Sequence, residues 1–431
     1  MKKPDSNEPS TGQATAAAEP PIAPASNGRL AGFDALKVPA YQWYSACVGL
    51  QQAAESMKTL ANGWFAFELT GSTAILGLTL LAQAIPQTLL SFFGGVISDR
   101  FPRHRVWQVC NFAALMLPLW MAASIFLGVI TWQYLVIQSF LFGIVVSFRA
   151  PARQGIMTEV VGRESIMSAV SLNQMISNIL QFVGPAAAGF LIGWAGIQWT
   201  YLAMAAFYVF AILSLMPMKY ERRNTSLKKG SRGSVFENIK DGLKYVGHTP
   251  DVRAVMGLTL LAGMFAMPYN QLLPAFGKTV LHTTPAMLGL LSSLAGIGAL
   301  TGSLGITLIR PKVRGALLIP VVFFTGVGLV AFCLSNSYVL SGAIVLVVGI
   351  GQALRQTVAS ALIQTYTENT YLGRVLSINF TQNGLSTTAS FAVAIGAQAI
   401  GIRYAVLTTS LLLMGVGALY WVFSRRLRRL A

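Results

Sequence analysis

GGVISDRFPRHR, residues 94–105, separates two long apolar runs of the chain. The paired glycines at its start would let two helices approach closely, because they carry no side chain. An aspartate in such a loop can accept hydrogen bonds from a neighbouring helix end, and arginines favour the cytoplasmic face of a membrane. The stretch therefore predicts a cytoplasmic connection between two membrane-spanning helices. Its candidate gating residues are Gly95, Asp99, Arg100, Arg103 and Arg105.

The composition is typical of a protein embedded in a lipid bilayer. The chain of 431 residues is 54% hydrophobic and only 10% charged, with a mean hydropathy of +0.60. Soluble domains carry about a quarter charged residues. A transmembrane helix needs about 20 mostly apolar residues. Such runs lie near 42–69, 73–97, 106–129, 131–151, 165–193, 198–217, 253–277, 285–309, 315–335, 338–362, 375–400 and 403–424. They predict an all-α membrane protein with twelve transmembrane helices.

The polar segments divide the chain. Residues 1–32 lack an apolar signal-peptide core and are rich in Pro, Ala, Ser and polar residues, which predicts a disordered cytoplasmic tail. The expected order is that tail, a six-helix bundle over 33–218, a cytoplasmic linker over 219–252, a second six-helix bundle over 253–424 and a basic tail over 425–431. Within the linker, Val235, Ile239 and Leu243 share one face of an amphipathic interfacial helix expected over 234–245.

The net charge of +17 is distributed asymmetrically. All but three of the 31 Lys and Arg residues fall in segments on one side of the predicted helices, and the exceptions are Lys58, Lys278 and Arg403. This is the positive-inside pattern, which places both termini in the cytoplasm. The same placement argues against nucleic-acid binding, which needs a basic patch on one face.

Weak internal repetition supports two halves of parallel topology. Arg149 recurs as Arg355, and the string Ser171-Leu172-Asn173 recurs as Ser377-Ile378-Asn379, each 206 residues later. Gly95 and Arg100 recur 210 residues later as Gly305 and Arg310, whereas Ile309 stands at the position of Asp99. A near-constant offset over several matches indicates two six-helix pseudo-repeats.

One helix carries ionisable residues at membrane depth. Gln51, Glu55, Lys58 and Asn62 are spaced to share a helical face. Charges inside a membrane are costly unless they are paired or wet, so intramembrane ionisable residues are functional candidates. One interpretation is a polar stripe that lines a central cavity, with Glu55 titrating protons or binding a cation and Lys58 as its partner or as an anion contact. The alternative is a Glu–Lys pair that only stabilises helix packing.

These features together resemble the major facilitator superfamily, in which a Gly-x-x-x-Asp-Arg loop follows the second helix. Pro102 departs from that pattern, where the family usually has glycine. The strings RAPARQ at 149–154, ELTGS at 68–72, LLPAF at 272–276 and GRV at 373–375 resemble the enterobactin-exporter and macrolide-efflux branch. The resemblance covers about residues 33–424. It implies a secondary transporter in a bacterial inner membrane, which works by alternating access.

The resemblance also ranks the other polar residues at membrane depth. In the superfamily the first, fourth, seventh and tenth helices line the path, which favours Gln138, Tyr269, Asn270 and Gln271 as pathway residues. It disfavours the amides of the fifth and eleventh helices: Asn173, Asn178, Gln181, Asn379, Gln382 and Asn383. Any single amide has the alternative role of an interhelical hydrogen bond. Pro268 and Pro274 free backbone groups in the seventh helix and permit bending.

Two features bear on the direction and the coupling of transport. Gly184-Pro185 partly matches the superfamily's antiporter motif in the fifth helix, and it also fits a kink that allows tight packing. The fourth helix has Ser139 where many proton-coupled drug antiporters have arginine, which weakens the case for ordinary multidrug proton antiport. Arg149 and Arg153, expected at the cytoplasmic end of that helix, do not simply replace it.

The sequence predicts no enzyme. It contains no P-loop, no HExxH or CxxC metal signature and no GxSxG nucleophile elbow, and Cys47, Cys110 and Cys333 lie in apolar runs without metal-ligand spacing. We therefore expect no cofactor and no metal. The predicted function is export of a small molecule by a monomer in the lipid bilayer, with protons as the coupling ion, a siderophore as the first substrate class and a macrolide-like drug as the second. The alternatives are a nutrient uptake symporter of the same fold and a non-transporting membrane receptor or scaffold.

Overall fold

The computed structural model describes residues 35–161, 165–218, 235–305 and 314–424, and within these ranges the regular structure is helical throughout. The helices are α1 (Pro39–Thr70), α2 (Thr73–Arg100), α3 (Arg103–Phe126), α4 (Trp132–Val160), α5 (Ile166–Ala195), α6 (Ile197–Leu215), α7 (Val235–His248), α8 (Pro250–Thr279), α9 (Pro285–Gly305), α10 (Arg314–Leu334), α11 (Tyr338–Tyr366), α12 (Asn369–Ile400) and α13 (Ile402–Phe423).

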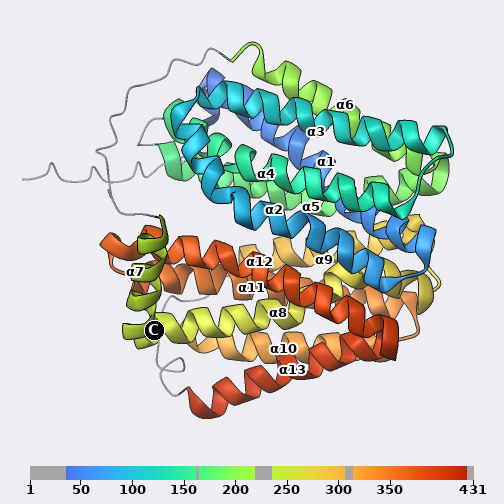
Figure 1. The fold of residues 1–431 in the computed structure, drawn as a ribbon. Coiled ribbons are helices and arrows are strands. Elements are labelled where there is room, and N and C mark those ends of the chain that lie inside the picture. Colours follow the sequence, from blue (N-terminus) through green and yellow to red (C-terminus); the bar gives the residue numbers. More distant parts are fainter. Residues whose placement is uncertain (1–34, 162–164, 219–234, 306–313, 425–431) are drawn as a thin grey trace, which may run out of the picture.

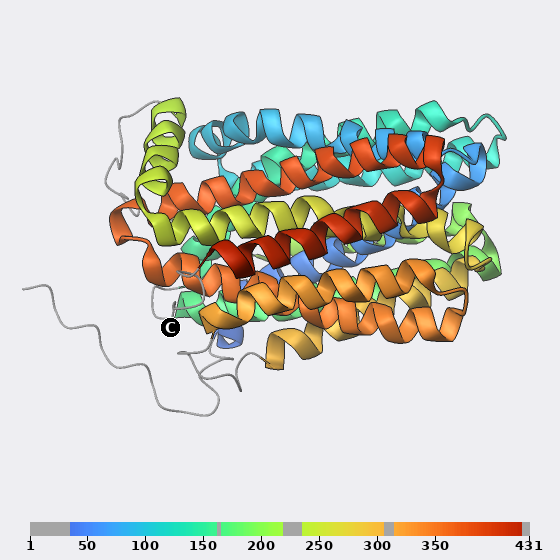
Figure 2. The same ribbon diagram turned by 90° about the horizontal axis from the view of Figure 1, so that it is seen from below.

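The long helices form two layers that run roughly parallel to one another (Figure 1). One layer contains α1 to α6 and the other contains α8 to α13, while the short α7 lies crosswise at one end of the second layer (Figures 1 and 2). The predicted fold class, an all-α membrane protein built from two six-helix pseudo-repeats, is confirmed. The predicted tails over 1–32 and 425–431 lie outside the described residues, as does the linker up to residue 234.

Most of the long helices can cross a bilayer on composition alone. Of the described helices, 10 are long and apolar enough to span a membrane. The remaining two long helices, α1 and α12, have 32 residues each. They are more polar, because α1 contains Glu55, Lys58 and Glu68 and because the first half of α12 is rich in polar residues. Polar residues in otherwise membrane-length helices indicate a wet or paired interior.

Local sequence explains the connection between α1 and α2. Pro39 begins α1 in the first turn, where a missing backbone N–H has no cost. Gly71 ends the helix with a φ of 62°, a left-handed conformation that glycine adopts without strain. The hydroxyl of Ser72 then accepts a hydrogen bond from the backbone N–H of Ile75 and caps α2. The chain thus reverses within two residues at the membrane boundary.

The amphipathic helix expected in the linker corresponds to α7. The ring of Tyr245 stacks on that of Tyr371 in α12, with ring centroids 4.4 Å apart and planes 12° from parallel. The hydroxyl of Tyr245 also accepts a hydrogen bond of 3.1 Å from the backbone N–H of Glu368, the residue that precedes α12. The linker helix is therefore attached to the second layer at the end where α12 begins.

Two seams join the halves, and the first is between α5 and α9. A Cβ added to Gly189 would lie 2.3 Å from the carbonyl oxygen of Pro285, and one added to Gly289 would lie 2.6 Å from that of Pro185. Ser293 also donates a hydrogen bond of 2.6 Å to the carbonyl of Phe182. The backbones are in direct contact along this seam because glycine stands on both sides.

The second seam is between α2 and α12. Thr73 donates to the carbonyl of Ala394 at 2.9 Å and its backbone N–H donates to Gln398 at 3.1 Å. A Cβ on Gly77 would lie 2.5 Å from that of Ala394, and one on Gly384 would lie 2.8 Å from the hydroxyl of Thr88. These contacts run from the helix midpoints toward the end away from α7 (Figure 1).

Candidate substrate and proton pathway

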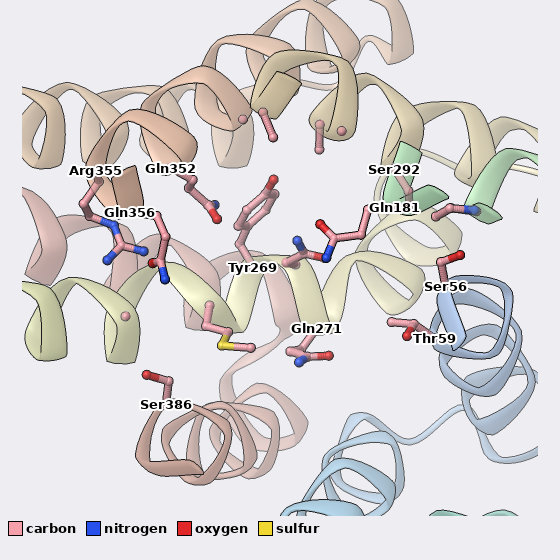
Figure 3. Close-up of a pocket in the computed structure, with 18 of the residues that line it drawn as sticks. Ser56, Thr59, Gln181, Tyr269, Gln271, Ser292, Gln352, Arg355, Gln356 and Ser386 are labelled. Atoms are coloured by element: carbon pink, nitrogen blue, oxygen red, sulfur yellow. The ribbon is translucent and has the colours of Figure 1, made fainter. Parts of the chain in front are cut away.

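A cavity of about 500 Å³ lies between the two layers near the midpoints of the helices. It is lined by residues of α1, α5, α8, α9, α11 and α12, so both halves contribute (Figure 3). The polar lining consists of Gln52, Glu55, Ser56, Thr59, Gln181, Thr259, Tyr269, Asn270, Gln271, Ser292, Gln352, Arg355, Gln356, Gln382 and Ser386. A mid-depth cavity between pseudo-repeats is the usual place for a transporter's substrate site.

The stripe of α1 that faces the cavity differs from the predicted one. The lining positions are Gln52, Glu55, Ser56 and Thr59, which follow the i, i+3, i+4, i+7 pattern of one helical face. Of the predicted stripe, Glu55 alone lines the cavity. The predicted and the observed stripes share Glu55 but lie on different sides of α1, rotated about the helix axis. Sequence spacing alone does not show which of the two faces the cavity.

The other members of the predicted stripe form hydrogen bonds inside the first half. Gln51 donates to Asn111 of α3 at 2.6 Å. Asn62 donates to Gln138 of α4 at 2.8 Å and accepts from the hydroxyl of Tyr201 in α6 at 2.8 Å. Gln138, which was favoured as a pathway residue, is therefore part of an interhelical hydrogen-bond network. This is the alternative role that was expected for any single amide. Buried amides need such partners whether or not they are near a cavity.

Lys58 is also directed into the first half. Its ammonium group donates to Gln83 of α2 at 2.6 Å and lies 3.5 Å from the ring centroid of Phe142 in α4. An amide oxygen and an aromatic face together replace part of the hydration of a buried ammonium. The expected Glu55–Lys58 pair is thus not formed.

Glu55 forms its ion pair with Arg149 of α4. The Arg149 side chain is 4% exposed and that of Glu55 is 25% exposed, so the carboxylate faces the cavity and the guanidinium lies behind it. The sequence placed Arg149 at a cytoplasmic helix end, but α4 continues for more than two turns beyond it, to Val160. Arg153, one turn further along α4, is half-buried.

The predicted cluster on α8 does lie on the cavity. Tyr269, Asn270 and Gln271 all contribute to the lining, and they directly follow Pro268 inside the helix. Tyr269 packs its ring edge-on against Phe332 of α10, with centroids 6.0 Å apart. Its position between the two ends of the cavity is visible in Figure 3.

Helices α5 and α12 contribute more than the resemblance implied. Gln181 and Pro185 of α5 and Gln382 of α12 line the cavity, although the amides of these helices were disfavoured. Gly184 itself does not line it: a Cβ there would lie 1.9 Å from the hydroxyl oxygen of Ser56. The glycine of the Gly184-Pro185 pair therefore allows α5 to pack on α1, while the proline faces the cavity.

The prediction missed the contributions of α9 and α11 and one residue of α12. Gln352, Arg355 and Gln356 line one end of the cavity, together with Ser386 of α12 (Figure 3). The repeat match of Arg149 with Arg355 was a signal for this end, because equivalent positions of two pseudo-repeats occupy similar places and Arg149 pairs with the cavity residue Glu55.

Some of the residues predicted to act in the loop at 94–105 form the expected kind of contact, and others do not. A Cβ on Gly94 would lie 2.1 Å from the carbonyl oxygen of Ser147, whereas nothing lies within 4 Å of one on Gly95. Close approach of α2 and α4 therefore depends on the first glycine and not on Gly95. Arg103 forms a salt bridge of 2.7 Å with Glu159 near the end of α4. Arg100 and Arg105 are exposed, and the side chain of Asp99 lies outside the described residues.

Comparison with known proteins identifies the family. A family described as transmembrane secretion effectors of the major facilitator type matches residues 31–429. The staphyloferrin A transporter of Staphylococcus aureus is 23% identical over 79% of this chain and 85% of its own length. The multidrug efflux pump Tap of Mycolicibacterium fortuitum is 24% identical over 88% and 94%, and the enterobactin exporter EntS of Citrobacter koseri is 24% identical over 79% and 79%.

Solved structures agree on the fold. The nucleoside transporter NupG superposes with a TM-score of 0.68 at 13% identity, over 90% of this chain and 99% of that one. A bacterial homologue of the human lysosomal transporter Spinster, in an inward-facing and occupied conformation, gives a TM-score of 0.70 at 13% identity over 89% and 96%. With the family match covering nearly the whole chain, this protein belongs to the transmembrane secretion effector family of major facilitator transporters.

Proposed function

We propose that this protein exports a small molecule from the cytoplasm in exchange for protons, and that Glu55 is the proton-binding group. One observation carries the proposal. Among the described residues, Glu55 provides the single carboxylate that lines the mid-depth cavity. A titratable carboxylate in a wet site at membrane depth is a functional candidate by default.

The ion pair with Arg149 suggests how proton binding is coupled to movement. A carboxylate cannot hold a proton and this ion pair at the same time, so protonation of Glu55 releases Arg149 from α1. The contact between α1 and α4 therefore has two discrete states. Coupling needs such a two-state element, because a proton can shift only an equilibrium whose two sides bind it differently.

The arrangement of the seams supports a cavity that faces the cytoplasm in this state. The contacts described for both seams lie at or beyond the helix midpoints, toward the end away from α7. The basic segments lie at the α7 end, which the positive-inside rule assigns to the cytoplasm. Both termini are then cytoplasmic. Export proceeds when the seams open and the α7 ends of the halves close, with the loop around Asp99 contributing to that closure.

The relatives favour export and narrow the substrate class. The multidrug pump and the enterobactin exporter are efflux proteins by name, and two relatives act on siderophores. We therefore place a siderophore first and a macrolide-like drug second. We further propose that the protein acts as a monomer in a bacterial inner membrane, since both halves of the cavity come from one chain.

The decisive experiment uses inside-out vesicles with an acidified lumen. Siderophores and macrolides are added in turn while the luminal pH is recorded for wild type, Glu55→Gln and Glu68→Gln. Glu68 is a matched control, because it lies on the same helix but bonds to Trp64 at 2.8 Å and does not line the cavity.

Substrate-triggered alkalinisation of the lumen in wild type and in the Glu68 variant, but not in the Glu55 variant, is the expected result. Normal proton-coupled flux at normal expression in Glu55→Gln would rule out the coupling role. Flux in the opposite direction would instead fit an uptake symporter.

A further inference from the structure

Equivalent arginines in the two halves differ in whether they form an ion pair. Arg149 in α4 is neutralised by Glu55, while Arg355, its counterpart in α11, lines the cavity with only 9% of its surface exposed. No described residue forms a salt bridge with Arg355, and its Nε atom is buried without a hydrogen-bond partner among them. A buried guanidinium without a counter-charge is unfavourable unless something else supplies that charge.

The sequence explains why the second half provides no counter-charge. The ends of α1 and α8 align at Ala66, Phe67 and Thr70 with Ala275, Phe276 and Thr279, an offset of 209 residues. At that offset the equivalent of Glu55 is Met264. The acidic partner has therefore been replaced by a thioether, while the arginine remains.

The acidic residues of the second half do not line the cavity. After residue 250 the chain contains two acidic residues, Asp251 in the first turn of α8 and Glu368 just before α12. Glu368 is exposed and follows Arg355 by about 20 Å of helix length, at 1.5 Å per residue.

A second buried donor lies on the same helix. Gln352 is one turn earlier on α11, and its amide Nε2 is also buried without a hydrogen-bond partner among the described residues. Gln352, Arg355 and Gln356 occupy one end of the cavity, and Ser56, Thr59 and Gln181 lie at the other (Figure 3). Two unsatisfied donors on adjacent turns, one of them cationic, match the two oxygens of a carboxylate.

We propose that Arg355 and Gln352 bind a carboxylate, or an equivalent organic oxyanion, of the transported molecule. The proposal rests on the proposed function only in taking this cavity as the substrate site. It assigns the substrate a class: an organic anion with further hydroxyl or amide groups, which the neutral amides and hydroxyls elsewhere in the lining hydrogen-bond. A purely cationic drug would meet like charge at this end.

The test measures binding to the purified full-length protein in detergent, by thermal unfolding at constant ionic strength. Citrate is the probe, because it is a compact tricarboxylate that fits a cavity of about 500 Å³, and its neutral trimethyl ester is the matched control ligand. The variants are Arg355→Gln, Arg355→Lys and Arg403→Gln. Arg403 is an arginine of the same half that bonds to Asn336 outside the cavity.

Citrate should raise the unfolding temperature of wild type and of Arg403→Gln, and the ester should not. Arg355→Gln should weaken citrate binding about tenfold or more, since a charge-assisted bond is lost. Arg355→Lys, which keeps the charge but not the fork of donors, should fall in between.

The proposal is overturned if citrate does not stabilise wild type, if Arg355→Gln binds it as well as wild type does, or if the ester or sulfate at equal ionic strength stabilises equally. Binding in detergent needs no proton gradient and no direction of flux. A failure of proton-coupled export therefore leaves this test unaffected, and a failure here leaves the Glu55 experiment unaffected.

Discussion

Replacing Gly189 with alanine should separate the seam between α5 and α9. The added Cβ would lie 2.3 Å from the carbonyl oxygen of Pro285 and 2.9 Å from the Cα of Gly289. Ordinary contact of a Cβ atom begins at 3.4 Å, so the helices must move apart by about 1 Å. Both obstructing atoms belong to the backbone and have no rotamer that relieves the clash.

The expected cost to this conformation is about 1–3 kcal/mol, the usual range for overpacking a close contact. That cost corresponds to a shift of roughly 5- to 150-fold toward the conformation in which the seam is open. Gly193→Ala is the matched control: it is one turn further along α5, and its Cβ would meet Ala286 at 3.8 Å, an ordinary contact.

Two assays test this expectation. The first is thermal unfolding of the purified protein. The second is the rate at which an impermeant maleimide labels Thr59→Cys, on the cavity wall, from the side opposite the basic segments. The native cysteines are buried and free, so they contribute little background. Gly189→Ala should unfold earlier and label faster than Gly193→Ala. Equal behaviour of the two variants in both assays would refute the reasoning.

Three further predictions concern single contacts. Arg149→Met should lose about 1–3 kcal/mol of stability, which is less than the loss for a fully buried pair, because the remaining Glu55 carboxylate is 25% exposed to the cavity. Adding Glu55→Gln should restore most of this loss in a double-mutant cycle. Additive losses from the two substitutions would contradict the ion pair. Lys58→Met should keep substrate flux and change stability by about 1 kcal/mol or less, since replacing a buried charge with an apolar side chain is often neutral. Loss of flux in a normally folded variant would show that Lys58 has a role beyond packing. Tyr245→Leu should release α7 from α12, because the stacking of Tyr245 on Tyr371 attaches the two helices. Limited proteolysis of the linker should then be faster than in wild type. Unchanged cleavage would mean that other contacts hold the helix.

The fold was predictable because the features that determine it extend over long stretches of sequence. Runs of about 20 apolar residues, the asymmetry of basic segments and a near-constant repeat offset each survive errors of several residues. The runs at 42–69 and 375–400, which correspond to α1 and α12, were identified as apolar although polar residues interrupt both. Even α7 was predicted, from three apolar residues on one helical face.

The site was only partly predictable, because burial makes paired and cavity-facing polar residues look alike in sequence. Gln51 and Gln52 are neighbours, yet the first bonds to Asn111 inside the bundle and the second faces the cavity. A rotation of α1 by one residue exchanges these roles. The partner of Glu55 lies 94 positions away, on another helix, so local spacing pointed to Lys58 instead.

The loop at 94–105 shows the same limit at a smaller scale. Either of two adjacent glycines satisfies the sequence pattern, and only the packing of α2 on Ser147 selects Gly94. The repeat, in contrast, contained information that local patterns did not. The recurrence of Arg149 as Arg355, combined with the absence of acids from the spans of the second half, is readable from the sequence alone once the halves are aligned.

The chemistry of the seams has a consequence for the conditions that move the carrier between states. Two ion pairs, Arg103–Glu159 and Glu55–Arg149, lie within the first half. Across the halves the contacts found among the described residues are glycines packed against backbone or side chains, neutral hydrogen bonds, and the Lys278 ammonium 5.1 Å from the ring centroid of Trp64. Salt screens charges but not close packing. Hydrostatic pressure and the lateral tension of the bilayer, which act on volume and area, should therefore shift the conformational balance more than ionic strength does.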